Sequence, residues 1–379
     1  MKLTTGQTPY FAVLDSLRGI CAMMVVLFHF HANSHIENLP LVRNSWLFVD
    51  FFFVLSGFVI AANYTTKLRN KDVSIWRFIG LRLARLYPLH LFMLGVFVAT
   101  EALMLAVRPV LVNVDRIPFE GTRSLSLIPE NAFLLQSLGR TFGLSGVESW
   151  NVPSWSISAE VWAYLVFAFA MIAGCRVIRL YRAFAFLVIP AAIIAFNSGS
   201  INLVTNGGVF RCIMGFGVGT VLWQMFQRYN PGQRNTGRWE IPVFAGMVLF
   251  VSYAPAYGVT LLAPVVFGIV LWVFSAEQGL LSRAFSAKGF LLLGVLSYSI
   301  YMVHSYLHAR LKNLTTLLEQ QSGLELFSPS KDNLFGTTLL AGDLFVVTGC
   351  ALTLIVSYAT WKFVEMPGQR LIRGWVNAT

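Results

Sequence analysis

The first apolar stretch of the chain, residues 12–32, carries an arginine and a histidine at a spacing that could do chemistry. Arg18 and His29 are 11 residues apart, so on a helix they share one face, roughly 16 Å apart along the axis. Ionisable groups inside a bilayer are costly, and by default they mark a functional site. An arginine can instead extend to the lipid headgroups, and a histidine can be a hydrogen-bonded packing residue. Either residue alone fits both interpretations.

Glu160 lies about a turn and a half inside another apolar stretch, which begins near Pro153. An unpaired carboxylate at that depth would be costly, so Glu160 needs a partner. His29, expected in the outer half of its own helix, lies at matching depth. A carboxylate behind an imidazole fixes its tautomer and stabilises its protonated form, as in a general base. His29 and Glu160 are therefore the predicted catalytic residues, with His304 and Asp50 as rival partners.

An Arg-x-x-Arg pair, Arg82 and Arg85, stands at a membrane entry and is followed by Tyr87 and Pro88. Residues three apart on a helix point the same way, and two adjacent guanidinium groups suit a phosphate or diphosphate. The alternative is that the pair only follows the positive-inside rule and attracts anionic lipid. The spacing favours an anion site at the cytoplasmic face.

Three further polar or small positions lie within apolar stretches. Ser56 and Gly57 are expected at mid-membrane, where a missing side chain admits a second backbone or a ligand. Simple helix packing is the better explanation of these two alone. Arg211 could form an ion pair with Asp50 or Glu160, or could hold an anionic substrate, and the sequence leaves these alternatives open.

These residues must be positioned by transmembrane helices. Of the 379 residues, 56% are hydrophobic and 12% are charged, against about 25% charged in a soluble domain. The pattern predicts an all-α, polytopic transmembrane bundle of about ten helices in a single domain. The expected spans are 12–32, 46–63, 86–107, 155–175, 183–198, 208–227, 241–255, 259–275, 289–308 and 338–362. The spans at 241–255 and 259–275 are short, and one broken segment is the alternative.

Charge distribution sets the expected orientation. With the N-terminus inside, the greater share of the 28 Lys and Arg residues falls at cytoplasmic span ends, which predicts both termini in the cytoplasm. The net charge of +11 therefore requires no nucleic-acid partner. Two stretches, 108–152 and 309–337, are expected to cap the outer face. Trp155 is placed like an interfacial anchor, and residues 362–370 should end the last helix abruptly.

The four cysteines all fall in apolar stretches, and none forms a C-x-x-C pair. We therefore expect neither disulfides nor a metal site. The first apolar stretch is not expected to be a cleavable signal, because Asp15 and Arg18 lie inside its start and no small-residue cleavage site follows.

Six short motifs occur in a consistent order along the chain. They are Asp15-Ser-Leu-Arg18-Gly19 with His29, Phe51-Phe-Phe-Val-Leu-Ser56-Gly57-Phe58, Arg82-Leu-Ala-Arg85-Leu-Tyr-Pro88, Ser154-Trp155-Ser-Ile-Ser-Ala-Glu160, Ser297-Tyr-Ser-Ile-Tyr301-Met-Val-His304 and Phe363-Val-Glu365-Met-Pro367. In these motifs the sequence resembles the acyltransferase-3 family of integral-membrane O-acyltransferases. Within that family it looks most like the exopolysaccharide (succinoglycan-type) O-acetyltransferase branch.

The resemblance implies transfer of a short acyl group, expected to be acetyl, from cytoplasmic acetyl-CoA to a sugar hydroxyl. The expected acceptor is a cell-surface or exported glycan or a lipid-linked oligosaccharide, and the expected location is a bacterial cytoplasmic membrane. Some relatives carry an added hydrolase-like domain, whereas here residues 1–379 are expected to be the membrane domain alone. No Gly-x-Ser-x-Gly elbow offers a covalent nucleophile, so direct transfer is the simpler mechanism.

The expected donor site comprises Arg18, Ser56, Gly57, Arg82, Arg85 and Tyr87. The expected acceptor site comprises Asp50, Asn151, Trp155, Arg211, Tyr298 and His304. The expected partners are acyl-CoA, the glycan acceptor and membrane lipids. A multispanning transporter of a sugar-linked or anionic substrate is the alternative, since it too would place His, Glu and Arg within spans. Such a protein usually shows two similar halves, which this sequence does not.

Overall fold

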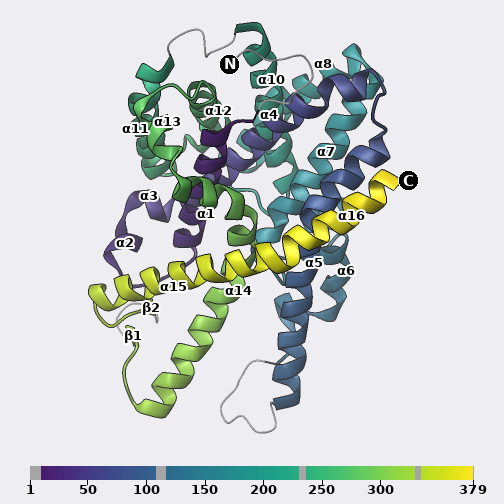
Figure 1. Cartoon of the computed structure of the whole chain (residues 1–379). Helices are drawn as coiled ribbons and strands as arrows, with labels where there is room; N and C mark the ends of the chain where they lie inside the picture. Colours follow the sequence, from purple (N-terminus) through teal and green to yellow (C-terminus); the bar gives the residue numbers. More distant parts are fainter. Residues whose placement is uncertain (1–9, 108–116, 230–235, 329–333, 379) are drawn as a thin grey trace.

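The computed structural model describes residues 10–107, 117–229, 236–328 and 334–378, and regular structure within them is almost entirely helical (Figure 1). The long helices are α1 (Ala12–Phe28), α4 (Phe48–Arg69), α5 (Ile75–Val107), α7 (Trp155–Ala173), α10 (Gly208–Tyr229), α11 (Glu240–Tyr253), α12 (Ala263–Phe274), α14 (Lys288–Ser322), α15 (Leu339–Thr360) and α16 (Met366–Ala378). The shorter ones are α2 (His35–Asn38), α3 (Pro40–Arg43), α6 (Ile128–Ala132), α8 (Cys175–Ala183), α9 (Ile189–Phe196) and α13 (Leu280–Phe285). Strands β1 (Phe327–Ser328) and β2 (Leu334–Phe335) pair antiparallel.

The all-α bundle predicted from the apolar stretches is confirmed. Among the described residues, seven helical segments are long and apolar enough to cross a membrane, which makes this an integral membrane protein. Helices α1, α11 and α12 are shorter but coincide with three of the predicted spans. Helices α11 and α12 are separate and pack against each other, so the alternative of one broken segment is wrong.

Three predicted boundaries are wrong because helices continue beyond the apolar stretches. Residues 64–87 are mostly helical, since α4 runs on to Arg69 and α5 begins at Ile75. Helix α14 continues through the expected outer cap to Ser322. Parts of the two expected caps, 108–116 and 329–333, lie outside the described residues.

The last helix does not stop at residues 362–370. A π-helical turn, Trp361–Glu365, joins α15 to α16, so that one helix runs from Leu339 to Ala378. This wider turn lies just before Pro367, which has no N–H to donate to the helix.

Helices α1 and α14 lie in backbone contact. A Cβ added to Gly294 of α14 would lie 2.4 Å from the carbonyl oxygen of Asp15 on α1, and one added to Gly19 would lie 2.4 Å from the carbonyl carbon of Leu293. Small residues permit such an approach between membrane helices. The two helices run parallel, and this contact sets which of their polar side chains can meet.

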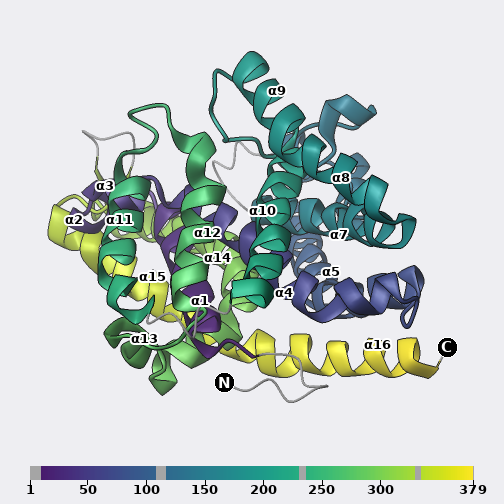
Figure 2. The same ribbon diagram turned by 90° about the horizontal axis from the view of Figure 1, so that it is seen from above.

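Helices α4 and α10 make the second close contact. Their residue contacts and the view from above both place them side by side (Figure 2). A Cβ on Gly57 would lie 2.1 Å from the carbonyl oxygen of Phe216, and one on Gly219 would lie 2.0 Å from that of Val54. Gly57 therefore serves helix packing, which is the explanation that the sequence favoured for it alone.

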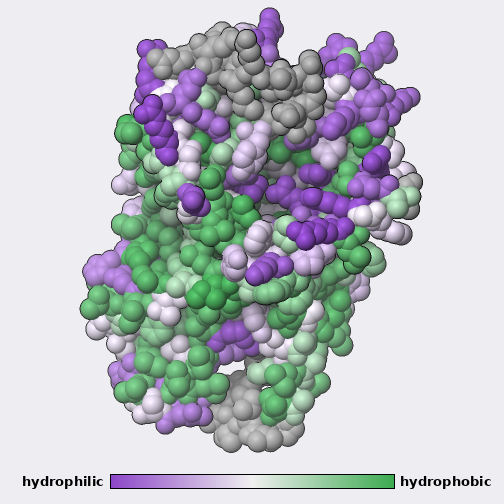
Figure 3. All heavy atoms as spheres, in the orientation of Figure 1, coloured by the Kyte–Doolittle hydropathy of each residue, from purple (hydrophilic) through white to green (hydrophobic). Residues whose placement is uncertain are grey.

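The outer surface is largely apolar. Figure 3 shows hydrophobic side chains over the left flank and much of the lower part, with hydrophilic ones gathered at the top and near the C-terminal end of α16. On α15, Leu344 and Ile355 are 68% and 67% exposed, as expected of side chains that face lipid. The helix faces away from lipid enclose the polar residues described next.

Candidate functional site

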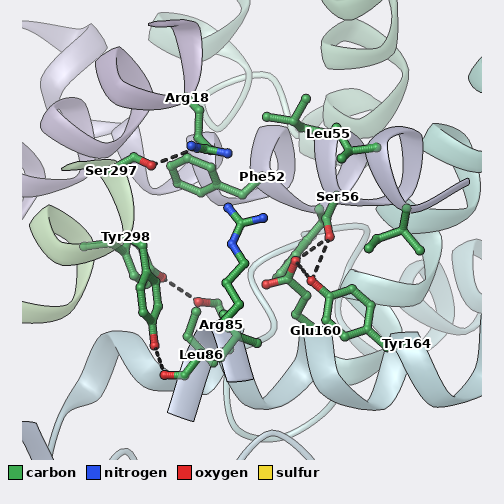
Figure 4. Close-up of a pocket in the computed structure, with 16 residues that line it drawn as sticks. Arg18, Phe52, Leu55, Ser56, Arg85, Leu86, Glu160, Tyr164, Ser297 and Tyr298 are labelled. Carbon is green, nitrogen blue, oxygen red and sulfur yellow. Dashed lines mark hydrogen bonds between the residues drawn. The ribbon is translucent and has the colours of Figure 1, made fainter. Parts of the chain in front are cut away.

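A pocket opens between α1, α4, α5, α7 and α14 and contains five of the predicted site residues (Figure 4). These are Arg18, Ser56, Arg85, Glu160 and Tyr298. Its apolar wall includes Phe52, Leu55, Val59 and Ile60 of α4. The pocket holds about 810 Å³ of space free of protein atoms, counting its open mouth.

The Arg18 guanidinium is held rigidly at one wall of the pocket. It forms an ion pair with Asp15, at 3.0 Å between Nη1 and Oδ1, within the first turns of α1. Its Nε donates to Ser297 Oγ at 2.8 Å and its Nη2 donates to the carbonyl oxygen of Gly294 at 2.7 Å. The close contact of α1 with α14 thus fixes this cation in a single direction.

Arg85 is the contrasting cation. Its guanidinium is turned toward the same space as that of Arg18 (Figure 4). Within the described part of the chain it makes no side-chain hydrogen bond, so its donors are available to an anion. Arg82, predicted to act beside it, instead donates to the Tyr64 hydroxyl at 3.0 Å and stacks over the Tyr64 ring. The two arginines do not form one fork, because Tyr64 holds Arg82 against α4.

Glu160 lies in the pocket with two hydroxyl partners. Its Oε1 accepts hydrogen bonds from Ser56 and from Tyr164, the residue one turn further along α7. Figure 4 shows this cluster opposite the Arg85 guanidinium. Glu160 therefore gives the pocket a fixed negative group facing a positive one.

His29 lies at the end of α1 beside His304 of α14. Its Nδ1 is 2.8 Å from the carbonyl oxygen of Val25, which can only accept, so Nδ1 carries a proton and Nε2 a lone pair. His304 Nδ1 likewise lies 3.2 Å from the carbonyl oxygen of Ile300, which leaves its Nε2 as an acceptor 3.3 Å from His29 Nδ1. His304 is completely buried. These contacts leave the lone pair on His29 Nε2 and place His304 behind the His29 ring.

The predicted contact between Glu160 and His29 is wrong. Each residue has different hydrogen-bond partners, and the residue behind His29 is the rival candidate His304. Helix α7 turns Glu160 toward Ser56 of α4, into the pocket that Arg18 of α1 also lines and His29 does not.

Tyr301 connects the pocket with the histidine pair. It lines the pocket, and its ring centroid lies 5.9 Å from that of His304 and 5.8 Å from that of Phe52. Its hydroxyl accepts a hydrogen bond from Ser156 at 2.8 Å. A molecule that filled the pocket would therefore reach the histidine pair past this ring.

Comparison with known proteins identifies the family to which this chain belongs. A family profile described as an acyltransferase domain matches residues 11–362. The chain belongs to the acyltransferase-3 family. This membrane acyltransferase is 32% identical over 160 residues to "Protein 2 in picA locus" of Rhizobium radiobacter, covering 42% of this chain and 81% of that protein. It is 26% identical over 326 residues to "Acyltransferase MdmB" of Streptomyces mycarofaciens, covering 77% of each chain. No solved structure matches it.

Two predicted acceptor residues of the acyltransferase form a buried ion pair. Arg211 donates from Nε and Nη2 to both carboxylate oxygens of Asp50, at 3.0 and 2.7 Å, and both side chains are almost fully buried. The Arg211 guanidinium also stacks over the ring of Trp155. Trp155 is 6% exposed, so it is no interfacial anchor; it fills the space left by Gly208. These three residues do not line the pocket.

The remaining predicted residues have backbone or packing roles. Tyr298 lines the pocket and donates to the carbonyl oxygen of Leu86 at 2.6 Å. Asn151 is buried and donates to the carbonyl oxygen of Met302, two residues before His304. Tyr87 does not line the pocket, and its ring lies 6.1 Å from that of His90.

Sequence reasoning missed Tyr164, Ser156 and Tyr301 of the acyltransferase pocket. Tyr164 follows Glu160 at the i, i+4 spacing of one helix face, which was a usable signal. Ser156 and Tyr301 stand within two of the recognised motifs, but hydroxyl groups on different helices can be matched only once helix rotation is known.

Proposed function

We propose that this acyltransferase moves an acetyl group from acetyl-CoA to a sugar hydroxyl of an exported glycan or lipid-linked oligosaccharide. In this proposal the protein belongs to the exopolysaccharide O-acetyltransferase branch and lies in a bacterial cytoplasmic membrane with both termini inside. The observation that carries the proposal is the hydrogen bonding of His29, which leaves one ring nitrogen free to take a proton.

His29 acts as the general base. The hydroxyl oxygen attacks the carbonyl carbon of the thioester, a C–O bond forms, and His29 Nε2 takes the hydroxyl proton. The C–S bond then breaks, and the imidazolium returns that proton to the departing thiolate. Val25 and His304 stabilise the imidazolium through its Nδ1–H, the part that Glu160 was first expected to play.

The pocket receives the donor. Arg85 binds donor phosphate through guanidinium N–H groups that have no hydrogen-bond partner in the described chain. The apolar α4 wall suits the uncharged arm between phosphates and thioester. Arg18 and His29 lie roughly 16 Å apart along α1, a distance that such an arm can cover. Glu160 and Tyr301 line the route toward the histidine pair.

The test is thiol release by the purified protein in nanodiscs, supplied with acetyl-CoA and a polysaccharide acceptor. Wild type should acetylate the acceptor, and His29→Ala should lower the rate by a factor of about 10² to 10⁴, as expected for loss of a general base. The matched control is His31→Asn, because His31 has a φ of 51° that asparagine tolerates better than alanine. Equal loss in both variants would contradict the assignment of His29.

A further inference from the structure

Pro88 interrupts the interior of α5, one turn after Arg85. Proline has no N–H and crowds the carbonyl groups of the preceding turn, which weakens the helical hydrogen bonds there. Two carbonyl oxygens beside Pro88 accept hydrogen bonds from side chains of other helices. Gln369 Nε2 of α16 donates to that of Arg85 at 3.4 Å, and the Tyr298 hydroxyl of α14 donates to that of Leu86 at 2.6 Å.

Helix α16 seats directly on this proline. A Cβ added to Gly368 would lie 2.4 Å from Pro88 Cβ, so only glycine fits there without displacement. Further along the same contact, a Cβ on Gly80 would lie 3.1 Å from Val376. Figures 1 and 2 both show α16 close to α5, and the two contacts above place it along the N-terminal part of α5.

The π-helical turn before α16 orients the part of α16 that packs against Pro88. It ends at Glu365, which is 5% exposed and accepts from Ser299 Oγ at 2.8 Å and from Gln369 Nε2 at 3.0 Å. Glu365 and Gln369 are one turn apart, so the two side chains link α14 to the Arg85 turn of α5. The carboxylate also interacts electrostatically with Arg85 and Arg18.

We propose that α16 is a positioning element of the donor pocket, in which Gly368 and Gln369 hold the Pro88 turn of α5 so that Arg85 points into the pocket. The Arg18 side chain is held by its hydrogen bonds to Ser297 and Gly294. The Arg85 side chain makes no hydrogen bond in the described chain, so the direction of its guanidinium depends on the backbone that carries it. The inference rests on the proposed function in assigning donor binding to Arg85.

The test compares two glycines of the same helix in the full-length protein. Gly368→Ala drives a Cβ against Pro88, while the control Gly374→Ala meets nothing within 4 Å. Binding of coenzyme A is measured by calorimetry, and KM and kcat by thiol release. Gly368→Ala should weaken coenzyme A binding and raise the donor KM about tenfold or more, with kcat at saturation and the acceptor KM unchanged. Gly374→Ala should match wild type.

The Arg85→Ala background separates positioning from general damage. If α16 acts through Arg85, Gly368→Ala added to Arg85→Ala should weaken binding no further. Gln369→Leu serves as a second variant should Gly368→Ala fail to fold, and it should weaken donor binding in the same way. Wild type that fails to bind coenzyme A would refute the proposed function itself. The positioning role would be overturned if wild type binds coenzyme A and Gln369→Leu, together with any folded Gly368→Ala protein, binds it equally well.

Discussion

Replacing His304 tests the histidine pair without touching the base itself. His304→Leu keeps an apolar group of similar bulk in a fully buried position but removes the acceptor behind His29. His304→Gln retains an oxygen that can accept from His29 Nδ1–H. The rates should therefore fall in the order wild type, His304→Gln, His304→Leu and His29→Ala.

The size of the effect follows from the hydrogen bonds. His29 Nδ1–H is shared between Val25 at 2.8 Å and His304 at 3.3 Å, so His304→Leu leaves the shorter bond in place. One neutral hydrogen bond contributes about 0.5–1.5 kcal/mol, which corresponds to roughly a two- to tenfold loss in kcat. A carboxylate partner would have implied a loss of about four orders of magnitude.

The assay is the initial rate of thiol release with both substrates saturating, normalised to folded protein. The control is His308→Phe, one turn further along α14, since no ring nitrogen of His308 has a hydrogen-bond partner in the described chain. His308→Phe should keep the wild-type rate. A loss in His304→Leu as large as that in His29→Ala would refute the supporting role and make His304 the base.

Two further predictions concern other regions of the molecule. Arg85→Ala should raise the donor KM roughly ten- to hundredfold, because a charge-assisted contact to phosphate is lost, and Arg85→Lys should restore it incompletely. Arg82→Ala, whose side chain is held by Tyr64, should have the smaller effect, and equal effects would contradict the distinction. In α2, between α1 and α4, burial raises the pKa of Glu37 to about 7 from 4.5. The folded state then binds more protons than the unfolded state between these values, so thermal stability should fall as pH rises from about 4.5 to 7. Glu37→Gln should flatten that dependence, and an unchanged slope would contradict the assignment.

The sequence could predict which residues lie in the pocket better than which residues touch. Arg18 and Glu160 stand out because ionisable groups are costly in a bilayer, and Arg85 stands out by its spacing from Arg82. Their partners depend on how each helix is rotated about its axis. Sequence periodicity tells which face of a helix points toward lipid and which toward protein, but not which side chain a given residue meets. The pairing of Glu160 with His29 failed because Glu160 lies in the pocket with Arg18, whereas His304 lies beside His29.

Helix ends were the least predictable part of the fold. Hydropathy marks where a helix leaves the apolar layer, but α5 and α14 remain helical well beyond it. Pro367 was a reasonable stop signal, but the helix continues past it through a π-helical turn, Trp361–Glu365, which composition does not reveal. Trp155 was misplaced similarly, since the space that receives its ring is created by Gly208 on another helix.

The ion pair of Asp50 and Arg211 has a consequence for how the protein is made. The two residues lie 161 positions apart in the chain, on α4 and α10. During synthesis α4 reaches the membrane long before α10 exists, so the Asp50 carboxylate waits without its native partner. Asp50 lies in the first turn of α4, so the cost is below the about 2.5–3.5 kcal/mol of a charged side chain at the centre of a membrane helix. Arrival of α10 removes that cost and draws α4 away from lipid, which makes their pairing a late commitment step in membrane assembly.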